Sequence, residues 1–177
     1  GVITASAGNH AQGVANACKK LKVPCLIVMP VTAPEIKVKS VKRFGSKVLL
    51  HGDNFDQASK KARQMAKEQK LEFIEAFDDP LTIAGQGTVG KEIFDEHNDL
   101  DVIFVPVGGG GLLAGISAWA AQTQTKTKIY GVEVEDSACL VEAIKADKRV
   151  RLREVGLFAD GVAVERIGKH NFDVIKE

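Results

Sequence analysis

The chain has 177 residues, of which 45% are hydrophobic, and its formal net charge is +1. This near-neutral balance excludes strong long-range attraction to nucleic acid or to an anionic membrane surface, so we expect neither as a partner. No apolar run approaches the roughly 20 residues that cross a bilayer, and the three cysteines show no CxxC spacing. We therefore expect buried thiols in a reducing, cytoplasmic compartment rather than disulfides or a zinc site.

Strand-like and helix-like segments alternate along the first part of the chain. The chain opens without an initiator Met, in what reads as the middle of a strand at Val2–Ala5, so we expect a piece of a longer protein. The polar segment "SAGNHAQG" then leads into a helix pattern that ends near Leu21. Next come a strand at 25–29, a helix at 34–44, a strand at 47–50, a helix capped by Asp53 or Asn54, and a weak strand at 72–74.

The second part of the chain continues the same alternation. The segment "FDDP" at 77–80 predicts a hinge between two lobes. After it we expect a helix at 82–97, a strand at 102–107, a glycine run at 108–111, a helix at 112–122 and a strand at 128–134. Unbroken apolar strands between helices indicate βαβ units with buried parallel strands, so the predicted fold class is α/β.

The motif "VPVGGGGLLAG" places four consecutive glycines between a predicted strand and a predicted helix. Four glycines cost conformational entropy on folding and supply no side-chain packing. They do allow several backbone N–H groups to converge at the positive end of the helix, where anions bind. We therefore predict a phosphate site in preference to a simple tight turn.

A dinucleotide site is a competing interpretation of the same glycines. Gly109, Gly111 and Ala114 satisfy the pattern GxGxxG/A, and Glu133 and Glu135 lie near the end of the next predicted strand. An acidic residue at that place binds a ribose in dinucleotide-binding folds. A nicotinamide-dependent oxidoreductase therefore stays open at this point.

The segment "SAGNHAQG" contains more polar groups than a turn requires. Asn9 and Gln12 are spaced as in a capping box, which would give both a structural role. That role leaves Ser6, Gly8 and His10 unexplained. A hydroxyl, backbone amides at a glycine and a helix start together suit a small carboxylate, so we predict a second anion site here.

The stretches "ASAGNHAQGVA" and "VPVGGGGLLAG" resemble the paired motifs of the fold-type II pyridoxal-phosphate enzymes, in particular the threonine and serine dehydratases. The resemblance continues through "LIVMP", "VLLHGDNFD", "IAGQGT", "GVEVEDSACL" and "VGLFADGVAVERIG", of which the last two are most similar to the biosynthetic threonine dehydratases. It implies parallel open sheets in two lobes, each with three αβα layers. Residues 1–76 would form the small lobe with the asparagine loop, and residues 77–177 would form part of the large lobe with the phosphate loop.

The resemblance also assigns roles to residues of the two motifs. The cofactor is implied to be pyridoxal 5′-phosphate, with its phosphate held by backbone N–H groups of Gly108, Gly109, Gly110, Gly111 and Leu112. Asn9 would hydrogen-bond the 3′ oxygen of the pyridine ring, and Gly161 would lie near the ring edge. The loop that closes on the substrate carboxylate would consist of Ser6, Ala7, Gly8, Asn9 and His10.

Other parts of the family's site are expected outside this chain. The Schiff-base lysine of the family precedes the asparagine loop, and the residue facing the pyridine nitrogen and the regulatory region lie beyond Glu177. We therefore expect no catalytic residue in this chain and no activity from it alone. A relative in the family binds a divalent cation through a residue matching Glu133, but its further acidic ligand falls on Cys139 here, so no metal is expected.

For the whole protein, the resemblance implies a lyase that converts L-threonine to 2-oxobutanoate and ammonia, the first step of isoleucine biosynthesis. It also implies a homo-oligomer, a tetramer in the family, in the cytoplasm or, for a plant source, in the plastid. A serine dehydratase or racemase of the same family stays open. So do a nicotinamide-dependent oxidoreductase and a binding fragment without activity.

Overall fold

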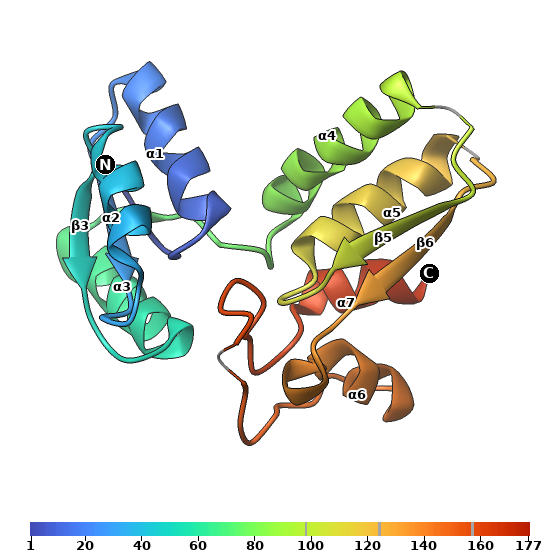
Figure 1. The fold of residues 1–177 in the computed structure, drawn as a ribbon. Coiled ribbons are helices and arrows are strands. Elements are labelled where there is room, and N and C mark those ends of the chain that lie inside the picture. The colour runs from blue at the N-terminus through green and yellow to red at the C-terminus, as the bar shows by residue number, and fades with distance from the viewer. Residues whose placement is uncertain (98, 124, 157) are drawn as a thin grey trace. The chain divides into compact units, whose positions relative to one another are not determined.

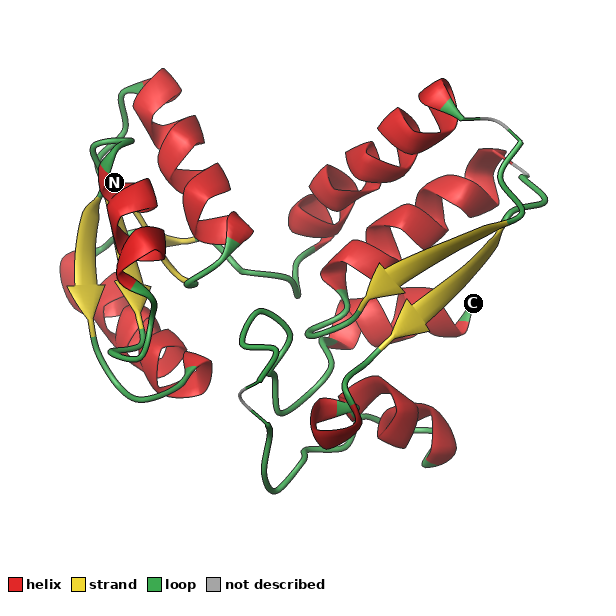
Figure 2. Ribbon diagram, in the orientation of Figure 1, coloured by secondary structure: helices red, strands yellow, loops and turns green. Residues whose placement is uncertain are grey.

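The computed structural model describes residues 1–97, 99–123, 125–156 and 158–177 (Figure 1). The chain divides into two compact units, Gly1–Ala76 and Phe77–Glu177. Both units contain parallel strands connected through helices (Figure 2). The α/β class predicted from the alternation of segments is therefore confirmed.

The first unit is built on a four-stranded parallel sheet with the strand order β3-β2-β1-β4. Its strands are β1 (Val2–Ala5), β2 (Cys25–Met29), β3 (Lys47–Leu50) and β4 (Glu72–Phe73). Its helices are α1 (Asn9–Leu21), α2 (Glu35–Lys42) and α3 (Phe55–Gln69). Each helix connects two strands that run in the same direction, which a short hairpin turn cannot do.

Strand β2 is buried on both faces of this sheet. Ile27 and Met29 face a cluster formed with α1 and α2, whereas Val28 faces a cluster formed with α3. All three side chains are completely buried. A strand covered on both faces reads in the sequence as an unbroken apolar run, which is the pattern that predicted it.

Helix α2 is shorter than predicted, and the structure decides between the two predicted caps of α3. Helix α2 begins at Glu35 and ends at Lys42, so it is shorter than the predicted segment 34–44. Helix α3 begins after Asn54, whose side chain accepts a hydrogen bond from the backbone N–H of Gln57 at 3.0 Å. Asn54 rather than Asp53 is therefore the cap of α3.

The second unit contains a two-stranded parallel sheet of β5 (Val102–Pro106) and β6 (Lys128–Val132). Its helices are α4 (Pro80–Glu96), α5 (Gly111–Thr123), α6 (Cys139–Lys145) and α7 (Lys169–Lys176), with a 3₁₀ turn η1 (Glu135–Ser137). Helix α4 starts two residues before the predicted position because Asp79 caps it. The Asp79 carboxylate accepts from the N–H groups of Leu81 and Thr82 at 2.9 and 3.0 Å.

The core of the second unit depends on segments that no sequence pattern predicted. Strand β5, the residue that follows it and helix α5 contribute Val105, Val107, Leu113 and Ile116 to this core. Residues beyond the last predicted strand complete it, namely Cys139, Leu140, Ala143, Ile167 and Phe172. Helices α6 and α7 are therefore structural parts of this unit rather than a peripheral tail.

The β5–β6 sheet has an uncovered face within the part of the chain that the structure describes. Phe104 is 70% exposed and Tyr130 is 48% exposed, and their rings stack with centroids 5.7 Å apart. The prediction of fully buried strands is wrong for this face, because no described helix or strand covers it. Across the described segments, no helix combines the length and apolar character needed to span a membrane.

Candidate functional site

Glycines 108–111 lie where they were predicted, between the end of β5 and the start of α5. Gly110 has a φ of +91°, a conformation that favours glycine, and a Cβ atom there would lie 2.5 Å from Cδ1 of Ile167. At Gly109 a Cβ atom would lie 2.3 Å from the ring of Phe77. Tight packing inside the unit therefore requires two of these glycines, in addition to any role toward a ligand.

The start of α5 presents backbone N–H groups without a competing negative charge. The helical hydrogen bonds begin with the N–H of Ala114, which donates to the Gly110 carbonyl at 2.9 Å. The preceding N–H groups of the first turn have no acceptor within the helix, and the helix dipole makes this end positive. No acidic residue stands in the first turn of α5. This arrangement fits an anionic group such as a phosphate.

Helix α7 holds the glycine loop from the side. The side chain of Asn171 is completely buried, and its Nδ2 donates to the carbonyl oxygen of Gly109 at 2.6 Å. The backbone N–H of Gly168 donates to the same oxygen at 3.0 Å. Among the described residues, Oδ1 of Asn171 is a buried acceptor with no hydrogen-bond partner. The sequence analysis missed Asn171, because a single polar residue in a short helix gives no pattern.

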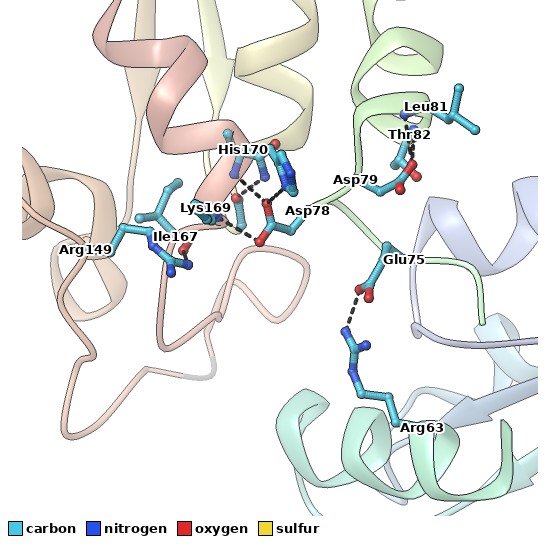
Figure 3. A network of polar contacts seen from close by, with 12 residues as sticks. Arg63, Glu75, Asp78, Asp79, Leu81, Thr82, Arg149, Ile167, Lys169 and His170 are labelled. Atoms are coloured by element: carbon cyan, nitrogen blue, oxygen red, sulfur yellow. Dashed lines mark hydrogen bonds and ion pairs between the residues drawn. The ribbon is translucent and has the colours of Figure 1, made fainter. Parts of the chain in front are cut away.

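Asp78 connects α7 to the segment that precedes α4 (Figure 3). Its carboxylate accepts from the backbone N–H groups of Lys169 and His170 at 2.7 and 2.8 Å and lies 3.2 Å from Nδ1 of His170. Partial burial opposes ionisation of Asp78, but the hydrogen bonds from Lys169 and His170 outweigh it and lower the pKa below its usual value. Asp78 therefore caps α7 as a carboxylate and helps to fix the helix that holds Gly109.

Glu133 and Cys139 support the other side of the glycine loop. The two carboxylate oxygens of Glu133 accept from the backbone N–H groups of Leu140 and Val141, each at 2.8 Å, so Glu133 caps α6. The Cys139 thiol is completely buried and lies 3.5 Å from the Gly108 carbonyl oxygen, to which it donates. Burial, followed by the nearby Glu133 charge, raises the pKa of this thiol to about 12. Glu133 is thus engaged in the fold and is a poor candidate for binding a ribose.

The predicted carboxylate loop, residues 6–10, lies at the corresponding turn of the first unit, between β1 and α1. The N–H of Ser6 donates to the Val28 carbonyl at 3.1 Å, and the Ser6 hydroxyl oxygen accepts from the N–H of Gly8 at 3.1 Å. Helix α1 begins at Asn9, with Gly8 as its N-cap and without a side-chain capping bond. The capping-box interpretation of Asn9 and Gln12 is therefore wrong.

The chemical groups of this loop are compatible with an anion. The first turn of α1 contains no acidic residue, and the side chain of Asn9 is exposed. The Ser6 hydroxyl accepts from Gly8, which leaves its own proton available for donation. His10 lies in the first turn with Nε2 at 3.0 Å from Oγ1 of Thr4. Burial lowers the pKa of His10, although a hydrogen bond to the Ile74 carbonyl opposes the shift, so we treat the ring as neutral at pH 7.

The segment around Gly161 contacts the glycine loop within the second unit. A Cβ atom at Gly108 would lie 3.0 Å from Cα of Val162. Gly161 itself has no atom within 4 Å of the position of a Cβ atom. Leu157, in the same predicted motif, lies outside the described residues. The structure thus brings the segment with Gly161 next to the loop with Gly108.

Comparison with protein families and curated proteins gives matches over the whole chain. The protein family described as "Pyridoxal-phosphate dependent enzyme" matches residues 1–177. The chain is 54% identical to the biosynthetic L-threonine dehydratase of Pasteurella multocida and 51% identical to that of Escherichia coli. Each match covers 100% of this chain and 34% of the relative. The chain therefore spans about a third of the length of these relatives.

Comparison with solved structures gives the same picture. Threonine deaminase isoform 2 from Solanum lycopersicum superimposes with a TM-score of 0.92 at 46% identity, covering 100% of this chain and 52% of that chain. A pyridoxal 5′-phosphate-dependent aspartate racemase superimposes with a TM-score of 0.92 at 32% identity, covering 100% of this chain and 54% of that chain. The fold that the sequence motifs implied, that of the fold-type II pyridoxal-phosphate enzymes, is therefore confirmed.

Proposed function

Because this chain belongs to the pyridoxal-phosphate dependent enzymes, we propose that the protein converts L-threonine to 2-oxobutanoate and ammonia, the first step of isoleucine biosynthesis. The glycine loop at the start of α5 carries the proposal, since it offers N–H groups to a phosphate and no acidic side chain in its first turn. Identities of 54% and 51% to biosynthetic L-threonine dehydratases support threonine as the substrate. The proposal concerns the whole protein, because this chain spans 34% of those relatives.

The residues of the glycine loop fit the phosphate of pyridoxal 5′-phosphate. Backbone N–H groups of residues 108–112 would hold it, with the dipole of α5 stabilising its negative charge. The carbonyl of Gly109 is already bonded to Asn171 and Gly168, and the carbonyl of Gly110 to Ala114, so these two oxygens are engaged elsewhere. When bound, the cofactor acts as an electron sink that makes the Cα proton of the amino acid acidic.

The carboxylate loop would bind and orient the substrate. The Ser6 hydroxyl and the N–H groups at the start of α1, up to His10, would hold the α-carboxylate. Asn9 would donate its side-chain N–H to the 3′ oxygen of the cofactor ring, and so fix the ring relative to the loop. In the overall reaction threonine loses its Cα proton and β-hydroxyl as water, and one water returns when nitrogen leaves as ammonia. Within this chain, the contribution of these residues is orientation.

We further propose that the two units are parts of two lobes of the enzyme. Residues 1–76 would be the small lobe, which carries the carboxylate loop, and residues 77–177 would be part of the large lobe, which carries the phosphate loop. The whole protein would be a homo-oligomer in the cytoplasm, or in the plastid if its source is a plant. The lysine that binds the cofactor would precede residue 1 in the whole protein.

An assay of the whole protein tests this function. We expect a visible absorbance band on addition of pyridoxal 5′-phosphate, and 2-oxobutanoate formation from L-threonine that exceeds pyruvate formation from L-serine. A matched reaction without cofactor is the control. Cofactor binding without 2-oxobutanoate formation would contradict threonine as the substrate, but it would agree with membership of the pyridoxal-phosphate dependent enzymes.

A racemase is the second candidate, and the structural match to aspartate racemase at a TM-score of 0.92 supports it. Chiral chromatography of the same reaction mixtures distinguishes the two, because a racemase yields the D-amino acid and releases no ammonia. A nicotinamide-dependent oxidoreductase receives no support, since the Glu133 carboxylate accepts two backbone N–H groups of α6.

A further inference from the structure

Thr4 and His10 form a polar contact that none of the roles above uses. Oγ1 of Thr4 lies 3.0 Å from Nε2 of His10 and donates to the carbonyl oxygen of Ile74 at 2.6 Å. Thr4 is on β1, Ile74 directly follows β4, and His10 is in the first turn of α1. The contact therefore joins the carboxylate loop to two neighbouring segments of the sheet.

Thr4 has one hydroxyl proton, and this decides which residue donates in the hydrogen bond between Thr4 and His10. A carbonyl oxygen can only accept, so the single hydroxyl proton of Thr4 is used in the bond to Ile74. Oγ1 of Thr4 can then only accept from His10, which requires a proton on Nε2. Thr4 is 0% exposed, so its hydroxyl is out of contact with bulk water. In a neutral ring, a proton on Nε2 leaves Nδ1 with a lone pair.

We propose that Thr4 is a positioning residue for the carboxylate loop and acts by holding His10 as the neutral Nε2–H tautomer. The inference rests on the proposed function, because that function assigns an amino-acid carboxylate to residues 6–10. Thr4 is completely buried, so its role runs through His10. The Thr4 hydroxyl sets the orientation and the tautomer of the His10 ring, and the backbone N–H of His10 is part of the carboxylate loop.

The tautomer decides what His10 can offer to a ligand. A neutral ring has a single N–H, which here faces both Thr4 and the Ile74 carbonyl, so the ring has no positive charge and no second N–H donor. The α-carboxylate must therefore be bound by the Ser6 hydroxyl and by backbone N–H groups, while Nδ1 can only accept a hydrogen bond. A substitution that releases the ring from Thr4 allows Nδ1 to take the proton and changes the donors around the carboxylate.

A direct measurement of the tautomer tests the inference without substrate. Nitrogen-15 NMR of the whole protein, labelled at histidine, separates a protonated ring nitrogen from one with a lone pair. The signal of His10 is assigned by its loss in the His10→Gln variant. We expect Nε2–H and unprotonated Nδ1 at pH 8. A proton on Nδ1 with a lone pair on Nε2 would overturn the inference, whether or not the protein deaminates threonine.

Variants of Thr4 test the positioning role. Thr4→Val removes the hydroxyl at nearly constant shape, and we expect KM for threonine to rise about fivefold to tenfold, as for loss of one hydrogen bond. The His10 signal should then include the Nδ1–H form. Thr4→Ser retains the hydroxyl and should restore both the tautomer and KM to within about twofold of the wild type.

Thr127→Val is the matched control, because Thr127 also donates its hydroxyl to a backbone carbonyl, that of Leu100 at 2.7 Å, but in the second unit. It should leave KM and the His10 signal unchanged. An equal rise in KM for Thr4→Ser and Thr4→Val, with the Nε2–H signal retained in both, would overturn the positioning role. If Thr4→Val does not fold, the inference is tested on the wild type and on Thr4→Ser, because His10 must show the Nε2–H form in both proteins.

Discussion

Asn171 donates its side-chain N–H to the carbonyl oxygen of Gly109 at 2.6 Å, although 62 positions separate the two residues in the chain. Through this bond a short helix near the end of the chain holds the loop that we assign to the cofactor phosphate. The bond matters for the site because the direction of each peptide plane in the loop decides where its N–H points.

Asn171→Asp should weaken cofactor binding and lower thermal stability. The substitution replaces the donor by a carboxylate oxygen that would face the Gly109 carbonyl in a buried site, at a cost of roughly 2 to 4 kcal/mol. Asn171→Leu is the matched variant, since it removes the bond together with the unpartnered Oδ1 and should cost about 1 kcal/mol or less. Titration of the cofactor-free whole enzyme with pyridoxal 5′-phosphate, together with thermal unfolding, measures both. Equal behaviour of the two variants would contradict this account.

Gly110→Ala should damage both the fold and the phosphate loop. A Cβ atom at Gly110 would lie 2.5 Å from Ile167, and the φ of +91° disfavours any L-residue, so we expect a loss of roughly 2 kcal/mol or more. Gly85→Ala is the control, because Gly85 is exposed in α4 with no atom near the added methyl group. That variant should gain about 0.5 to 1 kcal/mol. Chemical denaturation of both variants gives the comparison, and a neutral Gly110→Ala would contradict the observed packing.

Asn9→Asp should impair the contact with the cofactor without lowering the stability of helix α1. Asn9 is the first residue of α1 rather than its cap, and a carboxylate in the first turn stabilises a helix by about 0.3 to 1 kcal/mol. Asp cannot donate to the 3′ oxygen of the cofactor, so we expect a changed visible spectrum and lower turnover with unchanged or slightly raised stability. A wild-type spectrum and rate would remove Asn9 from the site. Lower stability would instead indicate a structural role that the observed helix start does not include.

Asp78 should make stability depend on pH at the acidic end. Its pKa is lowered in the folded state, so its contribution is fully present above the unfolded value of 3.8 and is lost as the pH falls through the lower folded value. Asp78→Asn cannot ionise, so the difference in unfolding free energy between wild type and variant should shrink below pH 3.8. Denaturation curves from pH 6 to pH 2 measure it, with roughly 1 to 2 kcal/mol expected at pH 6. A difference that stays constant with pH would mean that Asp78 acts through shape alone.

Local pattern was sufficient where an element is stabilised by its own residues. Strand β2 is an unbroken apolar run because both of its faces are covered, and α3 carries its cap at Asn54. The turn at 108–111 was found because four glycines are costly without a ligand or close packing, and the turn at 6–10 because it contains more polar groups than a turn requires. These features can be read over a few residues.

The elements that sequence reasoning missed depend on distant partners. Helix α7 has eight residues, too few to be stable alone, and Asp78 caps it from 91 positions away. The misassigned cap at Asn9 has a different cause, since the helix starts one residue earlier than a capping box at Asn9 requires and Gly8 takes the cap position. Local sequence patterns therefore could not predict the part of the site that depends on α7.

The stacked rings of Phe104 and Tyr130 have a practical consequence for work with this polypeptide. Parallel sheets in proteins are almost always covered on both faces, and an apolar sheet face left open to water promotes self-association. The 177 residues expressed by themselves should therefore sediment as concentration-dependent aggregates, and Phe104→Ser with Tyr130→Ser should increase the monomeric fraction. Poor solubility of such a preparation would be a property of this exposed face, and it would say nothing about how well the whole enzyme folds.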